Sequence, residues 1–248
     1  MIDAELGTVV VPCYNEERRI DPAGFAELIE GGLDVLFVDD GSTDDTVAVL
    51  SSICGANSGA ALLELEHNRG KGEAVREGLR EGLRRGASMV GYLDADLSTP
   101  PREYLVLAKT LHDRADIEAC LGARVALLGR EIHRRALRHY AGRLFATAAS
   151  VVIGVRVYDT QCGAKVFRSS AALEAALSKP FRSRWAFDVE LLQRLMEQGG
   201  AAGGLYPARE VPLESWSDID GSKLGLRAMA RTGLDLVRFW FTRWMKAR

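Results

Sequence analysis

An apolar run that ends in two carboxylates is the feature that most constrains how this chain can fold. Residues 89–101 read Met-Val-Gly-Tyr-Leu-Asp-Ala-Asp-Leu-Ser-Thr-Pro-Pro. The first half is typical of a buried β-strand, and the polar residues and prolines after it are typical of a turn that leads into a helix. Residues i and i+2 of an extended segment project to the same side, so Asp94 and Asp96 can converge on one point.

Two carboxylates that converge on one point are better ligands for Mg²⁺ or Mn²⁺ than for Zn²⁺. Mg²⁺ usually takes only one or two protein carboxylates and completes its shell with water and substrate phosphates. The same pattern also permits a purely structural loop, in which Asp94 ends the strand and Asp96 begins an Asx turn. The pair by itself leaves both interpretations open.

The same succession of strand, polar loop and helix recurs through the first half of the chain. Strands that alternate with helices predict a parallel α/β sheet with right-handed crossovers, and ligands bind such sheets beyond the carboxyl ends of the strands. Polar clusters fall at those ends, so we expect them to form one site. The predicted strands lie at 8–12, 35–38, 60–65 and 89–93, and the clusters are Asn15–Glu16, Asp39–Asp40, Gly70–Gly72 and Asp94–Asp96.

Other segments give weaker but usable signals. Ser42 or Thr43 is expected to cap the second helix. Pro212 cannot donate to a β-ladder, so the strand that holds it is expected at a sheet edge. The predicted helices lie near 23–30, 45–53, 73–85, 103–113 and 189–198, the shorter strands at 119–121, 166–167 and 210–213, and a polar loop at 216–222.

Composition and missing motifs exclude several classes of protein. The 248 residues are 47% hydrophobic and 27% charged, as in a soluble globular protein, and the formal net charge of −2 argues against a nucleic-acid partner. Glycines flank Lys71, whose ammonium suits a phosphate. However, no Gly-x-x-x-x-Gly-Lys-Ser/Thr occurs, and no Gly-x-Gly-x-x-Gly follows the first strand, which disfavours P-loop phosphotransferases and nicotinamide enzymes. Four cysteines without metal-type spacing fit a reducing compartment.

A series of short motifs resembles that of the family 2 glycosyltransferases, which have the GT-A fold. In order, the motifs are Val-Pro-Cys-Tyr-Asn-Glu (11–16), Val-Asp-Asp-Gly-Ser-Thr-Asp (38–44), Asn-Arg-Gly-Lys-Gly (68–72), Asp-Ala-Asp-Leu-Ser-Thr-Pro (94–100), Asp-Thr-Gln-Cys-Gly-Ala-Lys (159–165), Trp-Ala-Phe-Asp-Val-Glu (185–190) and Gly-Ser-Lys-Leu (221–224). Within the family the chain is similar to the dolichyl-phosphate and polyprenyl-phosphate glucosyl- and mannosyltransferases. Ser98 favours the glucosyl branch, because mannosyl relatives more often carry Gln at that place.

The resemblance implies an α/β fold of the GT-A (Rossmann-like) type, with a mostly parallel sheet flanked by helices. Residues 1–221 would form the catalytic domain and residues 222–248 a C-terminal amphipathic helix. The implied activity is inverting, metal-dependent transfer of a hexose, with glucose from UDP-glucose moved onto a polyprenyl phosphate. The alternatives are GDP-mannose as donor, a soluble or cell-envelope alcohol as acceptor, a sugar-nucleotide pyrophosphorylase, or a binding module without catalysis.

The resemblance also assigns roles to residues in the motifs. Asp188 is the acceptor-side carboxylate, which would take a proton from an alcohol or position a phosphate. Gln161 would lie beside the sugar and acceptor, and Arg124 would meet the phosphates. Structural roles stay open for many of these residues, such as a tight turn at Gln161 and a charge-capped helix at Asp188. The implied nucleotide-sugar ligands are Pro12, Tyr14, Glu16, Asp39, Asp40, Lys71 and Asp94; the metal ligands for Mg²⁺ or Mn²⁺ are Asp94 and Asp96; and the acceptor-phosphate ligands are Arg130, Arg134, Arg138, Ser222 and Lys223.

Two basic segments suggest contact with a membrane surface. Residues 124–143 carry six arginines and two histidines against the single acid Glu131, which suits either a solvated helix face or a face turned to an anionic lipid or acceptor. From Lys223 onwards, aromatic and basic residues suit either a helix in a membrane interface or one packed on the core. No apolar run reaches the ~20 residues that span a bilayer. We therefore expect a cytoplasmic protein, peripheral at the cytoplasmic face of a membrane.

Overall fold

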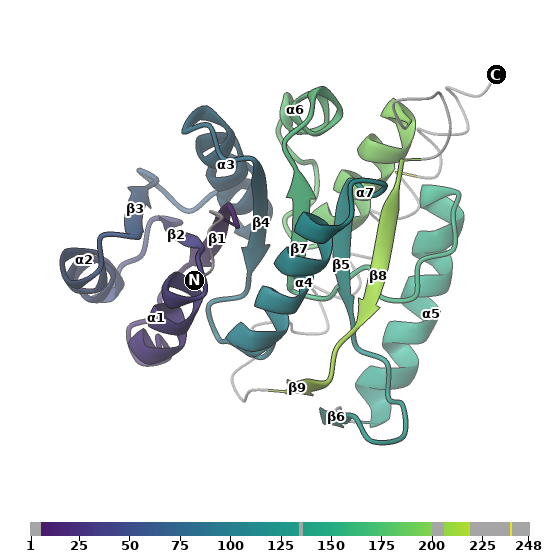
Figure 1. Ribbon diagram of the computed structural model, residues 1–248, viewed down its shortest axis with the longest axis horizontal. Helices are drawn as coiled ribbons and strands as arrows, with labels where there is room; N and C mark the ends of the chain where they lie inside the picture. Colours follow the sequence, from purple (N-terminus) through teal and green to yellow (C-terminus); the bar gives the residue numbers. More distant parts are fainter. Residues whose placement is uncertain (1–5, 134–135, 200–205, 219–238, 240–248) are drawn as a thin grey trace.

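A seven-stranded sheet forms the centre of the molecule (Figure 1). The computed structural model describes residues 6–133, 136–199, 206–218 and 239, and for 133 and 136–141 it describes the backbone alone. The strand order is β3-β2-β1-β4-β7-β5-β8. The bounds are β1 (Thr8–Cys13), β2 (Asp34–Asp39), β3 (Ala60–Glu64), β4 (Met89–Leu93), β5 (Ala119–Ala123), β7 (Ala164–Arg168) and β8 (Ala208–Pro212).

The sheet is mostly parallel, as the sequence predicts. β1 pairs in parallel with β2 and with β4, β2 with β3, and β5 with β8, whereas β7 runs antiparallel to both β4 and β5. The chain builds outwards from β1 to β3 and then crosses back to place β4 on the other side of β1. Such a switch of direction leaves a crevice at the carboxyl ends of the strands, where ligands bind in open α/β sheets.

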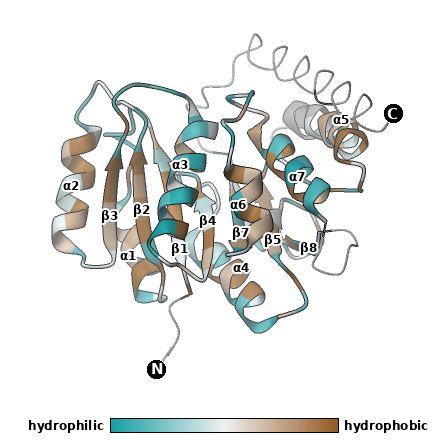
Figure 2. Cartoon of the chain, turned by 90° about the horizontal axis from the view of Figure 1, so that it is seen from above, coloured by the Kyte–Doolittle hydropathy of each residue, from teal (hydrophilic) through white to brown (hydrophobic). Residues whose placement is uncertain are grey.

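Helices cover both faces of this sheet, which explains why the central strands β1 and β4 are almost entirely apolar. Val9, Val10 and Val11 in β1 are each 0% exposed, because alternate residues enter two separate apolar clusters. Figure 2 shows α1 and α4 on one side of the sheet and α3 and α7 on the other. One cluster takes in α1 (Pro22–Glu30), α2 (Thr46–Ala56) and α4 (Pro101–Asp113), and the other takes in α3 (Lys71–Arg84), α5 (Ala136–Ile153), α6 (Ala171–Leu177) and α7 (Phe187–Gln198).

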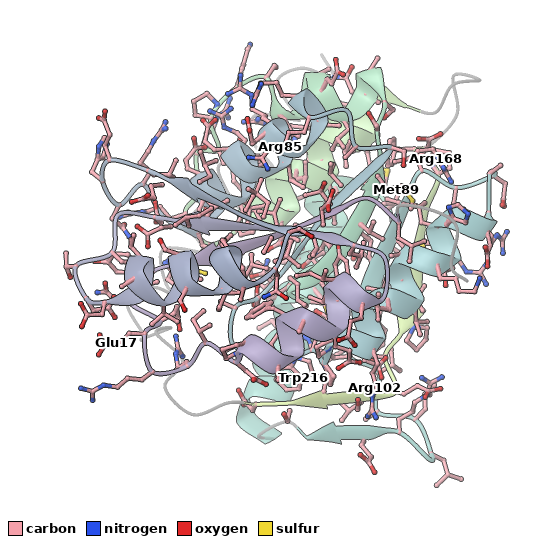
Figure 3. All side chains as sticks on the ribbon, turned by 60° about the vertical axis from the view of Figure 1, so that its left-hand side comes forward. Glu17, Arg85, Met89, Arg102, Arg168 and Trp216 are labelled. Atoms are coloured by element: carbon pink, nitrogen blue, oxygen red, sulfur yellow. The ribbon has the colours of Figure 1, made fainter. Side chains whose placement is uncertain are left out.

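A second, two-stranded sheet corrects the start of the polar loop predicted at 216–222, whose residues 219–222 lie outside the described residues. β9 (Ser215–Ser217) pairs in parallel with β6 (Glu131–His133). The buried carboxylate of Glu103 accepts hydrogen bonds from the backbone N–H of Glu214 at 3.0 Å and of Ser215 at 3.1 Å, which fixes the start of β9 on α4. Figure 3 labels Trp216, the middle residue of β9, at the lower edge of the molecule. A carboxylate distant in sequence therefore decides where this strand forms.

The predicted cap of α2 is also wrong, because the serine and threonine bond elsewhere. Asp45 is the N-cap residue and makes no side-chain cap hydrogen bond. Asn15 instead receives the N–H of Thr43 on its Oδ1 at 2.9 Å, and donates its own N–H to Ser42 Oγ at 3.0 Å. These bonds join the loop after β1 to the loop after β2. Helix α6 was not predicted at all.

Most of the predicted C-terminal helix, residues 222–248, lies outside the described residues. The exception is Phe239, which is 2% exposed and belongs to the apolar cluster on the side of α3 and α7. β8 lies at the edge of the main sheet, as predicted from Pro212. Within the described ranges, no helix has the length and apolar character that a bilayer crossing needs.

A pair of glycine substitutions tests this packing. A Cβ on Gly91, in the centre of β4, would come within 2.1 Å of Tyr104 Oη and 2.2 Å of the Lys165 carbonyl oxygen. We expect Gly91→Ala to lower the free energy of unfolding by about 1–3 kcal/mol or more through overpacking. Urea denaturation measures the change.

The matched control is Gly55→Ala on α2, where a Cβ would meet nothing within 4 Å. Because Ala is the better helix former by up to about 1 kcal/mol, this variant should be as stable as the parent or more so. Equal stability of the two variants would contradict the packing described for β4.

Candidate active site

A cluster of charged side chains lies at one end of the sheet, where β2 and β4 end and α3 begins. Asp39 closes β2, Asp94 follows β4, and Lys71 opens α3. Asp94, Asp96 and Asp188 all lie within electrostatic range of the Lys71 ammonium. The structure therefore brings together residues that are up to 117 positions apart in the sequence.

Lys71 and Asp94 form the ion pair at the centre of this cluster. Lys71 Nζ lies 2.6 Å from Asp94 Oδ1, and each side chain is less than a third exposed. Burial lowers the pKa of Lys71, but the surrounding carboxylates outweigh burial and hold that pKa above its ordinary value. Burial also raises the pKa of Asp94, and Lys71 opposes this effect. Lys71 is thus a charged group of the site and not a surface lysine.

Asp40 stabilises the turn that precedes Lys71 and positions it in the site. Its carboxylate is 2% exposed and accepts the backbone N–H of Arg69 at 2.7 Å and of Gly70 at 2.8 Å. Gly70 has φ +96, and a Cβ there would come 2.4 Å from Arg184 Nε, so the turn requires glycine. Asp40 therefore has a structural role, and its predicted contact with the nucleotide stays a prediction.

Asp39 offers what Asp40 lacks, an acceptor atom without a partner. Asp39 is 2% exposed, and its Oδ2 accepts the N–H of Ser42 at 2.9 Å. Its Oδ1 is buried and has no hydrogen-bond partner among the described residues. A buried acceptor without a donor costs about 1–3 kcal/mol, so a ligand that donates to Oδ1 would recover this free energy.

The loop after β1 places the other predicted nucleotide ligands. Pro12 and Tyr14 are half-buried. Glu16 is 9% exposed and pairs with Arg19, with 2.6 Å between Oε2 and Nε, so it is not a solvated helix end. Asn15, which the sequence places in a predicted polar cluster without a role of its own, adopts φ 51 and bonds the loop after β2. Positive φ at a non-glycine residue would have been the signal, but a sequence does not reveal it.

The Asp94-x-Asp96 segment fits both a turn and a metal site. Asp96 Oδ1 accepts the N–H of Ser98 at 3.0 Å and its hydroxyl at 2.5 Å, which is the predicted Asx turn. A Cβ on Gly163 would lie 2.3 Å from Asp94 Cγ, so only glycine leaves room for this carboxylate. In the part of the chain that the structure describes, no group of three or more His, Cys, Asp or Glu could hold a metal ion. Two carboxylates nevertheless suffice for Mg²⁺ when a substrate brings phosphate oxygens.

Arg124 is held by a residue that sequence reasoning did not single out. Asp159 receives Arg124 Nε on Oδ2 at 2.6 Å and Nη2 on Oδ1 at 2.8 Å. Burial lowers the pKa of Arg124, and Asp159 outweighs this and raises it, so the guanidinium stays charged. The Trp216 ring centroid lies 5.1 Å from Arg124 Cζ. In turn, Glu210 accepts the N–H of Asp159 at 2.8 Å.

Asp188 and Gln161, predicted to lie near the reacting groups, lie beside each other. Gln161 Nε2 is 3.5 Å from Asp188 Oδ2. Asp188 Oδ1 accepts hydrogen bonds from the hydroxyl of Tyr92 and, at 2.7 Å, from Lys165 Nζ. Sequence reasoning missed Tyr92 and Lys165. The available signal for Lys165 was a lysine directly before the apolar pair Val166 and Phe167.

The predicted acceptor-phosphate ligands are the least described part of the site. Arg130 donates to the Pro212 carbonyl oxygen at 3.0 Å and lies 3.8 Å from the Glu214 carboxylate. Arg134, Ser222 and Lys223 lie outside the described residues, and only the backbone of Arg138, in α5, is described. The roles of these residues stay predictions.

Comparison with known proteins identifies the family. The model of the family "Glycosyl transferase family 2" matches residues 8–174, from β1 into α6. The chain belongs to this family. It is 35% identical to a dolichyl-phosphate beta-glucosyltransferase of Drosophila melanogaster, over 94% of this chain and 74% of that protein. It is 33% identical to the Homo sapiens protein of the same name, over 88% of this chain and 69% of that protein.

Solved structures show the fold of this family 2 glycosyltransferase. The mannosyltransferase PcManGT from Pyrobaculum calidifontis, in complex with GDP-Man and Mn²⁺, superposes with a TM-score of 0.62 at 19% identity. The match covers 96% of this chain and 64% of that one. The predicted GT-A fold is confirmed, and the chain is an enzyme, a glycosyltransferase similar to the dolichyl-phosphate beta-glucosyltransferases.

Two neighbouring aspartates give a test of the site's construction. Asp40→Asn replaces one oxygen that accepts a buried N–H by an amide that cannot accept it. We expect the free energy of unfolding to fall by about 1–3 kcal/mol. Thermal and urea unfolding measure this loss.

The control is Asp39→Asn, because its amide oxygen can still accept the single N–H that Ser42 donates. This variant should lose less stability than Asp40→Asn, because no backbone hydrogen bond is removed. A larger loss for Asp39→Asn than for Asp40→Asn would contradict the roles assigned here.

Proposed function

We propose that this glycosyltransferase moves glucose from UDP-glucose to a polyprenyl phosphate, with inversion at the anomeric carbon. One observation carries the proposal. The Lys71–Asp94 ion pair lies at the strand ends among Asp96 and Asp188, in a chain 35% identical to a dolichyl-phosphate beta-glucosyltransferase. The name of that relative supplies the class of sugar and acceptor, and the site supplies groups for a diphosphate.

The donor end of the site would be built by β1, β2 and α3. The unpartnered Oδ1 of Asp39 would accept a hydrogen bond from the base or ribose of the nucleotide. The ammonium of Lys71 would exchange part of its contact with Asp94 for a phosphate oxygen, because an anion competes well for a cation held at a helix N-terminus. Pro12 and Tyr14 would line the nucleotide site.

Asp94 and Asp96 fit a divalent ion, Mg²⁺ or Mn²⁺, that binds together with the donor diphosphate. Such an ion neutralises the charge that develops on a departing diphosphate. Arg124 would act on the same charge: Asp159 engages its Nε and Nη2, so Nη1 can donate to phosphate oxygens. Charged donors fixed before the reaction stabilise a leaving group without reorganising.

The transfer itself is a direct displacement. An oxygen of the acceptor phosphate attacks the anomeric carbon, the bond from that carbon to the donor's phosphate oxygen breaks, and the electron pair leaves with UDP. A phosphate acceptor is already anionic and needs no general base. An alcohol acceptor would need one, and Asp188 is the carboxylate in place for that role.

A polyprenyl acceptor would be met at a membrane surface. The loop between β5 and β6 follows Arg124 directly and exposes two leucines beside Arg130. Leu128 is fully exposed and Leu127 is 49% exposed. Apolar side chains next to a cationic one suit insertion between anionic lipid headgroups. We therefore propose that this loop contacts the cytoplasmic face of a membrane.

The decisive experiment offers each donor with and without a lipid acceptor. UDP-glucose and GDP-mannose are each incubated with the full chain and Mg²⁺ or Mn²⁺, with or without a short polyprenyl phosphate, and release of nucleoside diphosphate is followed. We expect release from UDP-glucose to rise at least about tenfold with the lipid and to stop when the metal is chelated. Asp96→Ala should abolish metal-dependent binding of the donor in calorimetry while the protein stays folded.

Other outcomes select other functions. Release from GDP-mannose alone would make mannose the sugar, and release that ignores the lipid would direct the search to alcohol acceptors. Formation of UDP-glucose from glucose 1-phosphate and UTP would identify a pyrophosphorylase. Donor affinity that does not depend on metal in the parent chain would contradict the metal assignment.

The membrane contact gives a separate prediction. Replacing Leu127 and Leu128 together by Asp should reduce cosedimentation with vesicles of anionic phospholipid by about tenfold, because two apolar contacts are lost and two negative charges added. The control is Val106→Asp on α4, a residue that is also 53% exposed. Equal loss of binding in the two variants would show that this loop is not the contact.

A further inference from the structure

A fully buried lysine that the proposed mechanism leaves unused lies directly behind Asp188. Lys165 is 0% exposed. Its Nζ donates to Asp188 Oδ1 at 2.7 Å and to the Cys162 carbonyl oxygen at 2.6 Å. The Tyr92 hydroxyl donates to the same oxygen of Asp188. Burial of a lysine is costly unless its charge is paired, so this arrangement needs an explanation.

The sheet register brings these three residues together. Tyr92 in β4 and Lys165 in β7 are direct cross-strand partners. Both project to the face that α7 covers, and Asp188 lies in the first turn of α7. The Lys165 ammonium lies 5.2 Å from the centroid of the Tyr92 ring. Asp188 is therefore held from one side by two strands.

All of this support acts on one oxygen of the carboxylate. Oδ1 takes both donors, whereas Oδ2 is on the side of Gln161, 3.5 Å from its Nε2. The carboxylate cannot rotate without giving up these bonds.

The chemistry of a carboxylate limits what Oδ2 can bind besides Gln161. An ionised carboxylate only accepts hydrogen bonds. A fully deprotonated acceptor phosphate has no hydrogen to give, but a hexose offers several hydroxyl groups. Asp188 also lies within electrostatic range of Lys71 and Asp94, at the donor end of the site. A hydroxyl of the transferred sugar is therefore the group that fits.

We propose that Lys165 and Tyr92 are positioning residues that fix Asp188, so that Oδ2 accepts a hydrogen bond from a hydroxyl group of the transferred hexose. This inference rests on the proposed glycosyl transfer. Asp188 then orients the sugar for displacement and takes no proton from the acceptor. Lys165 balances its charge, so that the carboxylate does not repel the anionic substrates.

The sharpest test removes one hydroxyl group. Tyr92→Phe should lower kcat for transfer to the lipid phosphate about tenfold, because a hydrogen bond to a charged group is lost. The dissociation constant for UDP should stay within about twofold of the parent value, since nucleotide contacts are unchanged. Lys165→Met should show the same split between kcat and UDP binding, with a larger loss in kcat.

The matched control removes the same group on the other face of the sheet. Tyr104 is also 0% exposed, and its hydroxyl donates to the backbone carbonyl of Lys165 at 3.4 Å without touching Asp188. Tyr104→Phe should leave kcat unchanged. A Tyr92→Phe variant with the kcat of the parent, or a Tyr104→Phe variant that loses as much, would overturn the proposal even if Lys165→Met failed to fold.

Two further measurements address Asp188 and the sugar. In an Asp188→Asn background, Tyr92→Phe should have no further effect on kcat, because it acts through Asp188. One UDP-glucose analogue that lacks a single hydroxyl group should be a poor donor substrate for the parent. For Asp188→Asn, the same analogue should be as good a donor substrate as UDP-glucose. If every analogue lowers kcat by the same factor in the parent and in Asp188→Asn, the proposed contact between Asp188 and the sugar is wrong. A parent that transfers no hexose would overturn the proposed function together with this inference, whereas an active parent unaffected by Tyr92→Phe would overturn this inference alone.

Discussion

The ion pair between Lys71 and Asp94 is the interaction on which the rest of the site depends. It joins the first residue of α3 to the loop after β4, across the crevice where the chain changes direction. Asp40 must hold the turn before α3 for Lys71 to reach this position, and the missing side chain of Gly163 must leave room for Asp94. The ion pair therefore forms only when all three loops are correctly placed.

The site is assembled from charges that are already paired before a substrate arrives. Besides the central pair, Arg124 is bonded to Asp159 and Lys165 to Asp188. Buried charges must be compensated, and each of these pairs does so between segments far apart in the chain. Anionic substrates can then bind cations that are already fixed in place. Such cations stabilise negative charge without a reorganisation of the site.

Much of this arrangement could be predicted from the sequence, and what could not has a physical cause. The apolar run 89–93 is followed directly by Asp94, so both the strand and its polar end could be predicted. The strand β9 could not, because its position is fixed by hydrogen bonds that the backbone N–H groups at its start donate to the distant carboxylate of Glu103. Likewise the same spacing that predicts convergence of Asp94 and Asp96 could not show that Asp96 bonds Ser98.

By itself the sequence determined the fold class, the order of the strands along the chain and the polar groups that stand at their ends. These properties follow from local periodicity and turn chemistry, which each segment carries on its own. Only the tertiary structure decided which charges meet. Lys165 reaches Asp188 because β7 runs antiparallel beside β4 and α7 packs over both. Strand register and helix packing depend on the whole core, so no single segment encodes such a contact.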